Sequence, residues 1–359
     1  MKLKLSLLFI ILLVIIAPTS VYAIEVGGEI EVKGYTVGNN SEYSTLLQEK
    51  LNLELFLPET EKTEAKFEID IMTDSKTKSN NTQIKKLYLS RKYEEFDLTV
   101  GRQPISWLFG SLLNPVDFNL GAETIEQESS AKNVDAVEIY HPFNWGSNLT
   151  GVLSTTDSGK IKYGVRARTT INGYDLTANF VKERNDLEKR IAATLKGDIG
   201  TIGVYGAAGH YIEQNENIFL IGADYSFYQG IHQIILQGEY LYDKVGINNY
   251  LANIFTSSSN ILTTEVGSEL VAGTINYGID DFNTLKVTAL MHLEDSSLLL
   301  IPEYESQLVG NLDLNLRWGL LLGARGEVFG PQEINITDNS TSNLSNLDNF
   351  LEITLSYPF

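Results

Sequence analysis

Apolar and polar residues alternate through almost the whole chain, and this pattern constrains the fold more than any other feature. The last nine residues show it: apolar Leu351, Ile353, Leu355, Tyr357 and Phe359 alternate with Glu352, Thr354, Ser356 and Pro358. A period of two is typical of a β-strand with one apolar and one polar face. Beyond the first 23 residues, no stretch shows a sustained helical period of 3.6.

The alternation predicts eighteen strands, within a range of sixteen to twenty. The expected strands are 24–37, 44–57, 63–74, 83–93, 96–104, 133–141, 147–156, 160–170, 173–183, 187–197, 200–213, 216–228, 230–243, 268–280, 282–294, 297–309, 312–327 and 348–359.

Connection lengths are sorted along the chain. Those after even-numbered strands are short, and several carry turn sequences such as "INGY" and "GDIG". Those after odd-numbered strands include three long ones, at 105–132, 244–267 and 328–347. Short turns on one side, longer loops on the other and both chain ends on the short side are typical of an outer-membrane barrel. A soluble β-sandwich has no reason to sort its loops in this way.

The strand faces predict the surroundings of the sheet. In "LDLNLRWGLLLGARGEV", leucines and Trp318 share one face, while Asp313, Asn315 and Arg317 share the other. Eighteen strands without helices leave only lipid to cover the apolar face. Because backbone groups in hydrocarbon must all be paired, the sheet has to close. The predicted fold is therefore all-β: a transmembrane antiparallel up-and-down barrel over 24–359, with both termini periplasmic.

Residues 1–23 have the features of a secretory signal peptide. Lys2 and Lys4 precede an apolar run, which ends at Pro18 and a small-residue site before Ile24. A membrane anchor is the alternative, although the run is short for a spanning helix. Cleavage would remove two lysines and leave a net charge of 25 − 46 = −21, which argues against a nucleic-acid partner. The chain has no cysteine, so neither a lipoprotein anchor nor a disulfide framework is expected.

The terminal strand resembles that of bacterial outer-membrane porins, which characteristically end on phenylalanine. The resemblance implies that Tyr357 and Phe359 are recognised by the barrel-assembly machinery of a diderm bacterium. It also implies an outer-membrane location and a role as a channel.

A second resemblance lies in "VGRQPISWLFGSLLNPVDFN", residues 100–119. The segment is similar to one found in alginate-export-type and related porin-like barrels, and the matching residues are Gly101, Arg102, Gln103, Trp107, Asn114, Pro115 and Asp117. Looser matches at 133–140 and 298–305 bring the similarity to about a quarter of the chain. It implies the fold and a transport role and leaves the substrate open.

The 105–132 connection is the third outward loop, and in classical porins the third loop folds into the lumen as a constriction. Its acidic residues, expected to line such a constriction, are Asp117, Glu123, Glu126 and Glu128. An external cap is the alternative. Arg102 and Asp135 flank the base of the loop and are predicted to form a pair that anchors it; otherwise Arg102 snorkels at the rim.

Charges on the expected inner face are separated around the ring. A basic wall on the eighth to tenth strands is predicted from Lys162, Arg166, Arg168, Lys182, Arg190 and Lys196. Opposite it, acidic residues predominate near both chain ends, among them Glu29, Glu31, Glu68, Asp70, Glu303 and Glu352. Facing walls of opposite sign create a transverse field that filters solutes by polarity. Ordinary hydrated lumen residues without net ordering are the alternative.

These features predict a porin for small hydrophilic solutes, such as saccharides or organic ions. The expected partners are outer-membrane lipid, the barrel-assembly machinery and the solute; no cofactor, metal or nucleic acid is expected, and the oligomeric state stays open. An adhesive or structural barrel with a blocked pore is one alternative. An outer-membrane hydrolase is another, although the four histidines have no ligand spacing and no catalytic motif is present.

Overall fold

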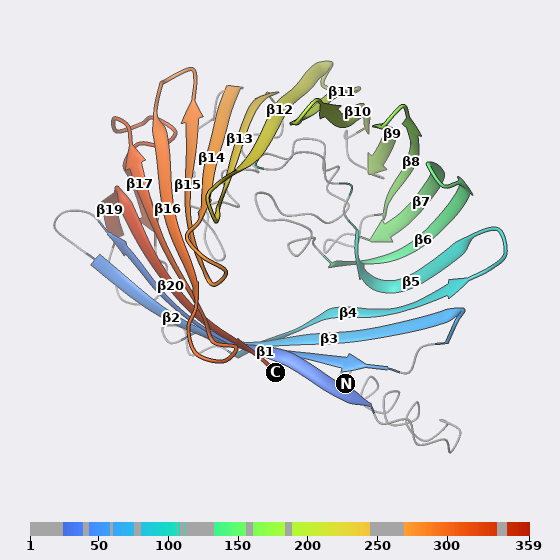
Figure 1. Ribbon diagram of the computed structural model, residues 1–359, viewed down its shortest axis with the longest axis horizontal. Coiled ribbons are helices and arrows are strands. Elements are labelled where there is room, and N and C mark those ends of the chain that lie inside the picture. Colours follow the sequence, from blue (N-terminus) through green and yellow to red (C-terminus); the bar gives the residue numbers. More distant parts are fainter. Residues whose placement is uncertain are drawn as a thin grey trace.

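The computed structural model describes residues 24–38, 43–57, 60–74, 80–105, 107, 112, 133–155, 161–183, 189–244, 269–335 and 343–359. The expected signal peptide, 1–23, lies outside these ranges. Within them no helix is both long and apolar enough to cross a membrane. The described chain is built from strands, turns and short connections (Figure 1).

The strands follow one another in chain order. Their bounds are β1 (Glu25–Gly38), β2 (Tyr43–Phe56), β3 (Thr63–Asp74), β4 (Asn80–Lys92), β5 (Asp97–Pro104), β6 (Asn133–Asn144), β7 (Ser147–Thr155), β8 (Ile161–Ile171), β9 (Tyr174–Glu183), β10 (Lys189–Ile199), β11 (Ile202–Tyr211), β12 (Glu216–Gln229), β13 (His232–Asp243), β14 (Glu269–Gly278), β15 (Asn283–His292), β16 (Leu298–Gln307), β17 (Asp313–Leu322), β18 (Gln332–Asn335), β19 (Asn343–Leu347) and β20 (Asn349–Pro358).

Eighteen of the strands, β1–β17 and β20, form one closed antiparallel sheet. Each of β1–β16 pairs with the next strand in the chain, β17 pairs with β20, and β20 pairs back to β1. Figure 1 shows these strands as a ring. At the seam the backbones of Gly28 and Phe359 exchange two hydrogen bonds, of 3.0 and 2.9 Å. No strand of the ring therefore presents an unpaired edge.

The predicted strand number is confirmed, and most boundaries agree within three residues. β17 differs most, because it ends at Leu322 and not near 327. Beyond it the chain turns back on itself, with Glu327 donating to the Ala324 carbonyl and Gly330 to the Glu327 carbonyl. The predicted 328–347 loop also contains β18 and β19, which pair with each other outside the ring.

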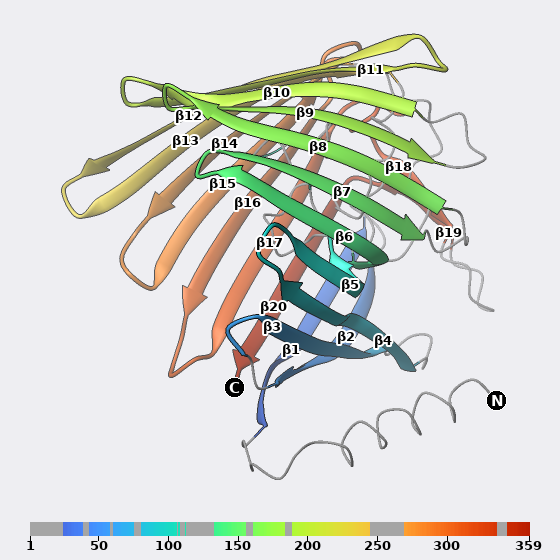
Figure 2. The same ribbon diagram turned by 90° about the vertical axis from the view of Figure 1, so that its right-hand side faces the viewer.

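Local sequence explains the turns and one irregularity of the sheet. Between β8 and β9, Asn172 and Gly173 have φ of 51° and 83°, the left-handed pair that a tight hairpin of matching twist requires. Between β3 and β4 the register shifts after Glu68, so that Lys85 is an extra residue. This bulge brings Lys85 Nζ to 3.2 Å from Asp70. Figure 2 shows the strands inclined around the ring, as closure of a barrel demands.

Candidate pore

Side chains of the closed sheet alternate between an outward and an inward face. On β20, Leu351, Ile353 and Leu355 are exposed, whereas Phe350, which points to the opposite face, is buried. Trp318 of β17 lies beside Leu351 and is exposed as well. The exposed apolar rows mark the outer face, which suits contact with lipid, and the intervening rows line the interior.

The basic wall lies on the inward face of β8 and β10. In the register, Arg166 is opposite Asn179, and Arg190 is opposite Val181; both partners are buried inward residues of β9. Lys182 is one residue out of phase, because it lies opposite Tyr163 and Lys189 on the outward rows. The prediction that Lys182 belongs to the basic wall was therefore wrong.

Burial divides the remaining basic residues into two groups. Lys162 and Arg190 are only 3% and 6% exposed. Arg190 donates to the Tyr211 hydroxyl at 3.3 Å, and its guanidinium lies 5.1 Å from the centre of that ring. Arg166, Arg168 and Lys196 are more accessible. The basic surface open to a solute is accordingly narrower than the sequence predicts.

Salt bridges hold Arg168, one of the accessible arginines, and several acids near the chain ends. Arg168 binds Asp175 at 2.6 Å. Asp70 pairs with Lys85 and Glu68 with Lys86, while Asn52 donates to both acids at 2.7–2.8 Å. The further pairs are Lys33–Glu352 and Lys286–Glu303, each at 3.4 Å. Several acids of the predicted acidic wall are thus compensated locally, which weakens a field across the lumen.

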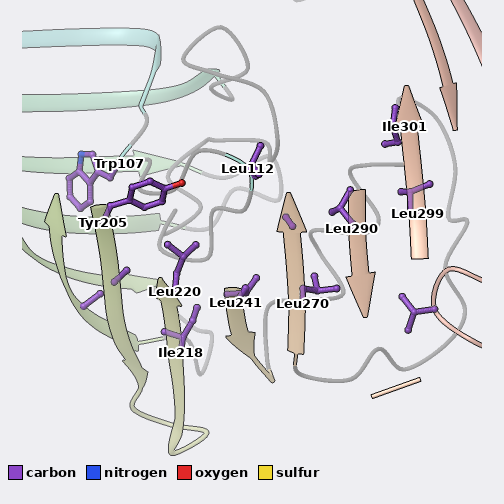
Figure 3. Close-up of a cluster of buried hydrophobic side chains, with 14 of the residues drawn as sticks. Trp107, Leu112, Tyr205, Ile218, Leu220, Leu241, Leu270, Leu290, Leu299 and Ile301 are labelled. Carbon is purple, nitrogen blue, oxygen red and sulfur yellow. The ribbon is translucent and has the colours of Figure 1, made fainter. Parts of the chain in front are cut away.

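An apolar inner wall lies on β11–β17, toward the ends of the strands that lead into the loops. Each member is at most 5% exposed, and the residues are Tyr205, Ile218, Leu220, Leu241, Leu270, Leu290, Leu299, Ile301 and Leu321. Figure 3 shows most of them along one side of the interior. The sequence predicts a polar inner face here. Some segments, such as "LLLI" at 298–301, have apolar residues at both the inward and the outward positions. Such segments indicate a strand that is covered on both faces.

The chain enters the lumen directly after β5. Gln103, Ile105 and Trp107 are all buried, and Trp107 belongs to the same buried cluster as Tyr205 (Figure 3). Further on, the backbone N–H of Leu112 donates to Glu239 Oε1 of β13 at 2.9 Å. β5 and β13 lie eight positions apart in a ring of eighteen, so this hydrogen bond joins the chain that leaves β5 to a strand almost opposite in the ring. We name Ile105, Trp107 and Leu112, the residues of this connection that the structure describes, the lumen-crossing segment.

Two predicted groups relate to this loop. The acids proposed to line the constriction, Asp117, Glu123, Glu126 and Glu128, lie outside the described residues. Arg102 and Asp135 are opposite each other in the register, and Arg102 Nη1 lies 3.7 Å from Asp135 Oδ2. Both are in phase with exposed Val100 and Val137, so the pair lies on the outward row, at the base of the loop.

His292 at the end of β15 lies in a hydrogen-bonded cluster with the chain beyond β17. Its Nδ1 lies 2.8 Å from Asp295 Oδ1. Burial raises the pKa of Asp295, but hydrogen bonds from Val328 N–H and from Ser297 outweigh it and lower the pKa from 3.8 to about 2. Because Ser297 Oγ donates to Asp295 at 2.7 Å, this serine is not activated by the histidine. Across the described ranges, no three potential metal-ligating side chains gather.

The predicted assembly residues lie at the seam. Tyr357 is opposite Ile30 of β1 and is exposed on the outward face, as is Phe359. Their recognition by assembly machinery stays a prediction.

The fold class is that of an eighteen-stranded transmembrane barrel with a lined interior. No family model matches the sequence, and neither does any curated protein. Solved structures of outer-membrane porins from Pseudomonas aeruginosa match it. OccK10 (OpdN) has a TM-score of 0.58 at 9% identity, covering 93% of this chain and 98% of that one. OccK2 (OpdF) in complex with glucuronate gives 0.59 at 9%, covering 93% and 96%. OpdO gives 0.58 at 12%, covering 94% and 97%.

At these identities the comparison establishes the fold: this chain is built like the Occ and Opd porins. The likeness of residues 100–119 to alginate-export-type barrels stays a prediction.

Proposed function

We propose that this protein is an outer-membrane channel through which small hydrophilic solutes diffuse. The observation that carries the proposal is the closed ring of eighteen strands, whose lumen is too wide for its own side chains to fill. Its short turns would face the periplasm and its longer loops the outside. The matched porins share this architecture and are channels, so we propose no catalytic activity.

The lumen-crossing segment supports a constriction rather than an external cap. Trp107 and Leu112 are buried, and Leu112 reaches the inner wall of β13. We propose that Asp117, Glu123, Glu126 and Glu128 continue this constriction, facing Arg166, Arg168 and Lys196. We further propose that the Arg102–Asp135 pair anchors the base of the loop. An excess of acids over bases should make the pore mildly cation-selective while still admitting organic anions.

A barrel with a blocked pore is the second candidate, and the apolar inner wall favours it. Residues that are at most 5% exposed inside a barrel are covered, so part of the lumen is filled. Such a barrel would serve as an adhesive or structural element.

Planar-bilayer recording of the refolded protein separates the two candidates. The channel hypothesis expects discrete conductance steps in potassium chloride. Liposomes should also swell in glucose and in glucuronate, the acidic sugar bound by one of the matched porins. A barrel that shifts on heating in gel electrophoresis but gives neither steps nor swelling would support the blocked pore.

A further inference from the structure

Three inward residues on neighbouring strands form a seat at the far end of the lumen crossing. The register aligns Tyr205 of β11, Gly222 of β12 and Glu239 of β13 in one row. The Tyr205 hydroxyl donates to Glu239 Oε1 at 2.6 Å, so its ring passes over the strand between them. The same carboxylate oxygen accepts the backbone N–H of Leu112.

Gly222 provides the space for this reach. A Cβ at position 222 would lie 2.3 Å from Tyr205 Cε2 and 2.5 Å from Cζ, which no side chain tolerates. The backbone of Gly222 is not in the left-handed region, so the requirement is for space and not for a glycine conformation. Any larger residue must therefore displace the tyrosine ring.

Glu239 is costly to bury and is held by strong hydrogen bonds. It is 3% exposed, and a buried carboxylate is tolerated only where donors satisfy it. Two donors converge on one oxygen, and one of them is a main-chain amide of the loop. Because Glu239 binds the backbone of Leu112, the contact fixes the path of the chain at this residue. The Leu112 side chain is buried as a member of the same apolar cluster (Figure 3).

We propose that Tyr205, Gly222 and Glu239 are positioning residues that hold the lumen-crossing segment against β13 and so set the width of the channel. The docking of Leu112 stands on contacts alone, whereas its effect on the channel rests on the proposed function. Glu239 is the acceptor, Tyr205 supports the carboxylate, and Gly222 lets the two meet.

The absence of cysteine from the chain allows a direct test. Leu112→Cys introduces a single thiol and keeps the backbone N–H that Glu239 accepts. In the refolded barrel, the rate of modification by a water-soluble methanethiosulfonate reagent measures how often residue 112 leaves its seat. Glu239→Ala and Gly222→Ala are added separately to this background. Gly238→Ala is the matched control, because it adjoins Glu239 in sequence and a Cβ there meets nothing within 4 Å.

The seat predicts that Glu239→Ala raises the modification rate about 10- to 100-fold, as loss of a charged hydrogen bond should. Gly222→Ala should raise it about 10-fold, and Gly238→Ala should leave it unchanged. An unchanged rate in Glu239→Ala and Gly222→Ala barrels that still shift on heating would overturn the proposal. So would an equal rise in the Gly238→Ala control.

Conductance separates this proposal from the proposed function. Glu239→Ala without the cysteine should give larger and noisier single-channel steps than the unmodified protein. If the unmodified protein does not conduct but the modification rates rise as expected, the seat stands and the channel hypothesis fails. If it conducts and the rates do not change, the seat alone fails.

Discussion

The inner faces of β8–β10 and of β11–β17 differ in chemistry, although the same alternation builds both. On β8–β10, inward positions carry Arg166, Asn179 and Thr194 between apolar outward rows. On β11–β17, leucines occupy inward positions near the loops while apolar residues also face outward. The first region offers groups that bind water and solutes. The second offers a dry surface on which chain from the loops can pack, and Leu112, whose backbone N–H donates to Glu239 of β13, lies at this surface.

The largest expected effect is on conductance, and it comes from deleting the loop that follows β5 and packs on the apolar inner wall. Deleting residues 108–128 should raise single-channel conductance by about two-fold or more, because conductance is set at the narrowest section. The exposed wall should also increase binding of an apolar dye. Planar-bilayer recording and dye fluorescence measure the two effects. Unchanged conductance in an intact barrel would show that this loop is a cap outside the lumen.

A smaller effect should distinguish packed from lipid-facing leucines. Leu241 is fully buried on the apolar inner wall, and Leu241→Ala should lower the free energy of unfolding by about 3 kcal/mol through the cavity it leaves. Leu195→Ala, on the exposed outward row of β10, should cost about 1 kcal/mol. Urea unfolding in detergent micelles compares them. Equal losses would mean that the inner wall is not a packed core.

Substitutions on the polar inner face of β8–β10 should change the ion selectivity of the channel rather than the stability of the barrel. Arg166→Gln with Arg168→Gln should shift the reversal potential in a salt gradient toward cations, by on the order of 10 mV. Arg190→Gln should shift it less, because Arg190 is buried against Tyr211. Lys182→Gln is the control on the outward row and should shift it not at all. A shift from Lys182→Gln as large as that from Arg166→Gln would contradict the assigned faces.

The smallest effect concerns acid stability at the loop side of β15 and β16. The folded pKa of Asp295 is lowered from 3.8 to about 2, so its stabilisation is complete above about pH 4 and is lost as the pH falls toward 2. Asp295→Asn should remove this dependence and change the melting temperature by about 2 °C or less. Melting curves from pH 2 to 7 test this, with Asp281→Asn as the control. Parallel curves for the unmodified protein and Asp295→Asn would refute the assignment.

Sequence alone predicts the barrel because each strand can be recognised from its own residues. Alternation in segments such as 351–359 defines two faces locally, and hairpin turns such as Asn172–Gly173 define the order. The same alternation places Lys182 outward, in phase with Leu176, Ala178 and Phe180, so that error was avoidable.

Glu239 was out of reach of sequence analysis. In "QGEYLYD" it is an ordinary inward acid of a lumen, and its partner Leu112 lies 127 residues away in sequence. Nothing local to either residue predicts the contact. The apolar inner wall is not predicted for a related reason. A strand with apolar residues on both faces must be covered on both faces, but its sequence does not say which part of the chain covers it.

The seam between β1 and β20 has a mechanical consequence. Because the first and last strands of the ring are neighbours, a load applied to either chain end acts on the seam, where the two strands pair over ten positions. We expect such a load to peel the barrel in steps, one hairpin at a time, starting at the end that is pulled. The force that resists unfolding would then depend on the hydrogen bonds between two neighbouring strands and not on the whole barrel. A barrel without an open edge would still unfold one strand pair at a time.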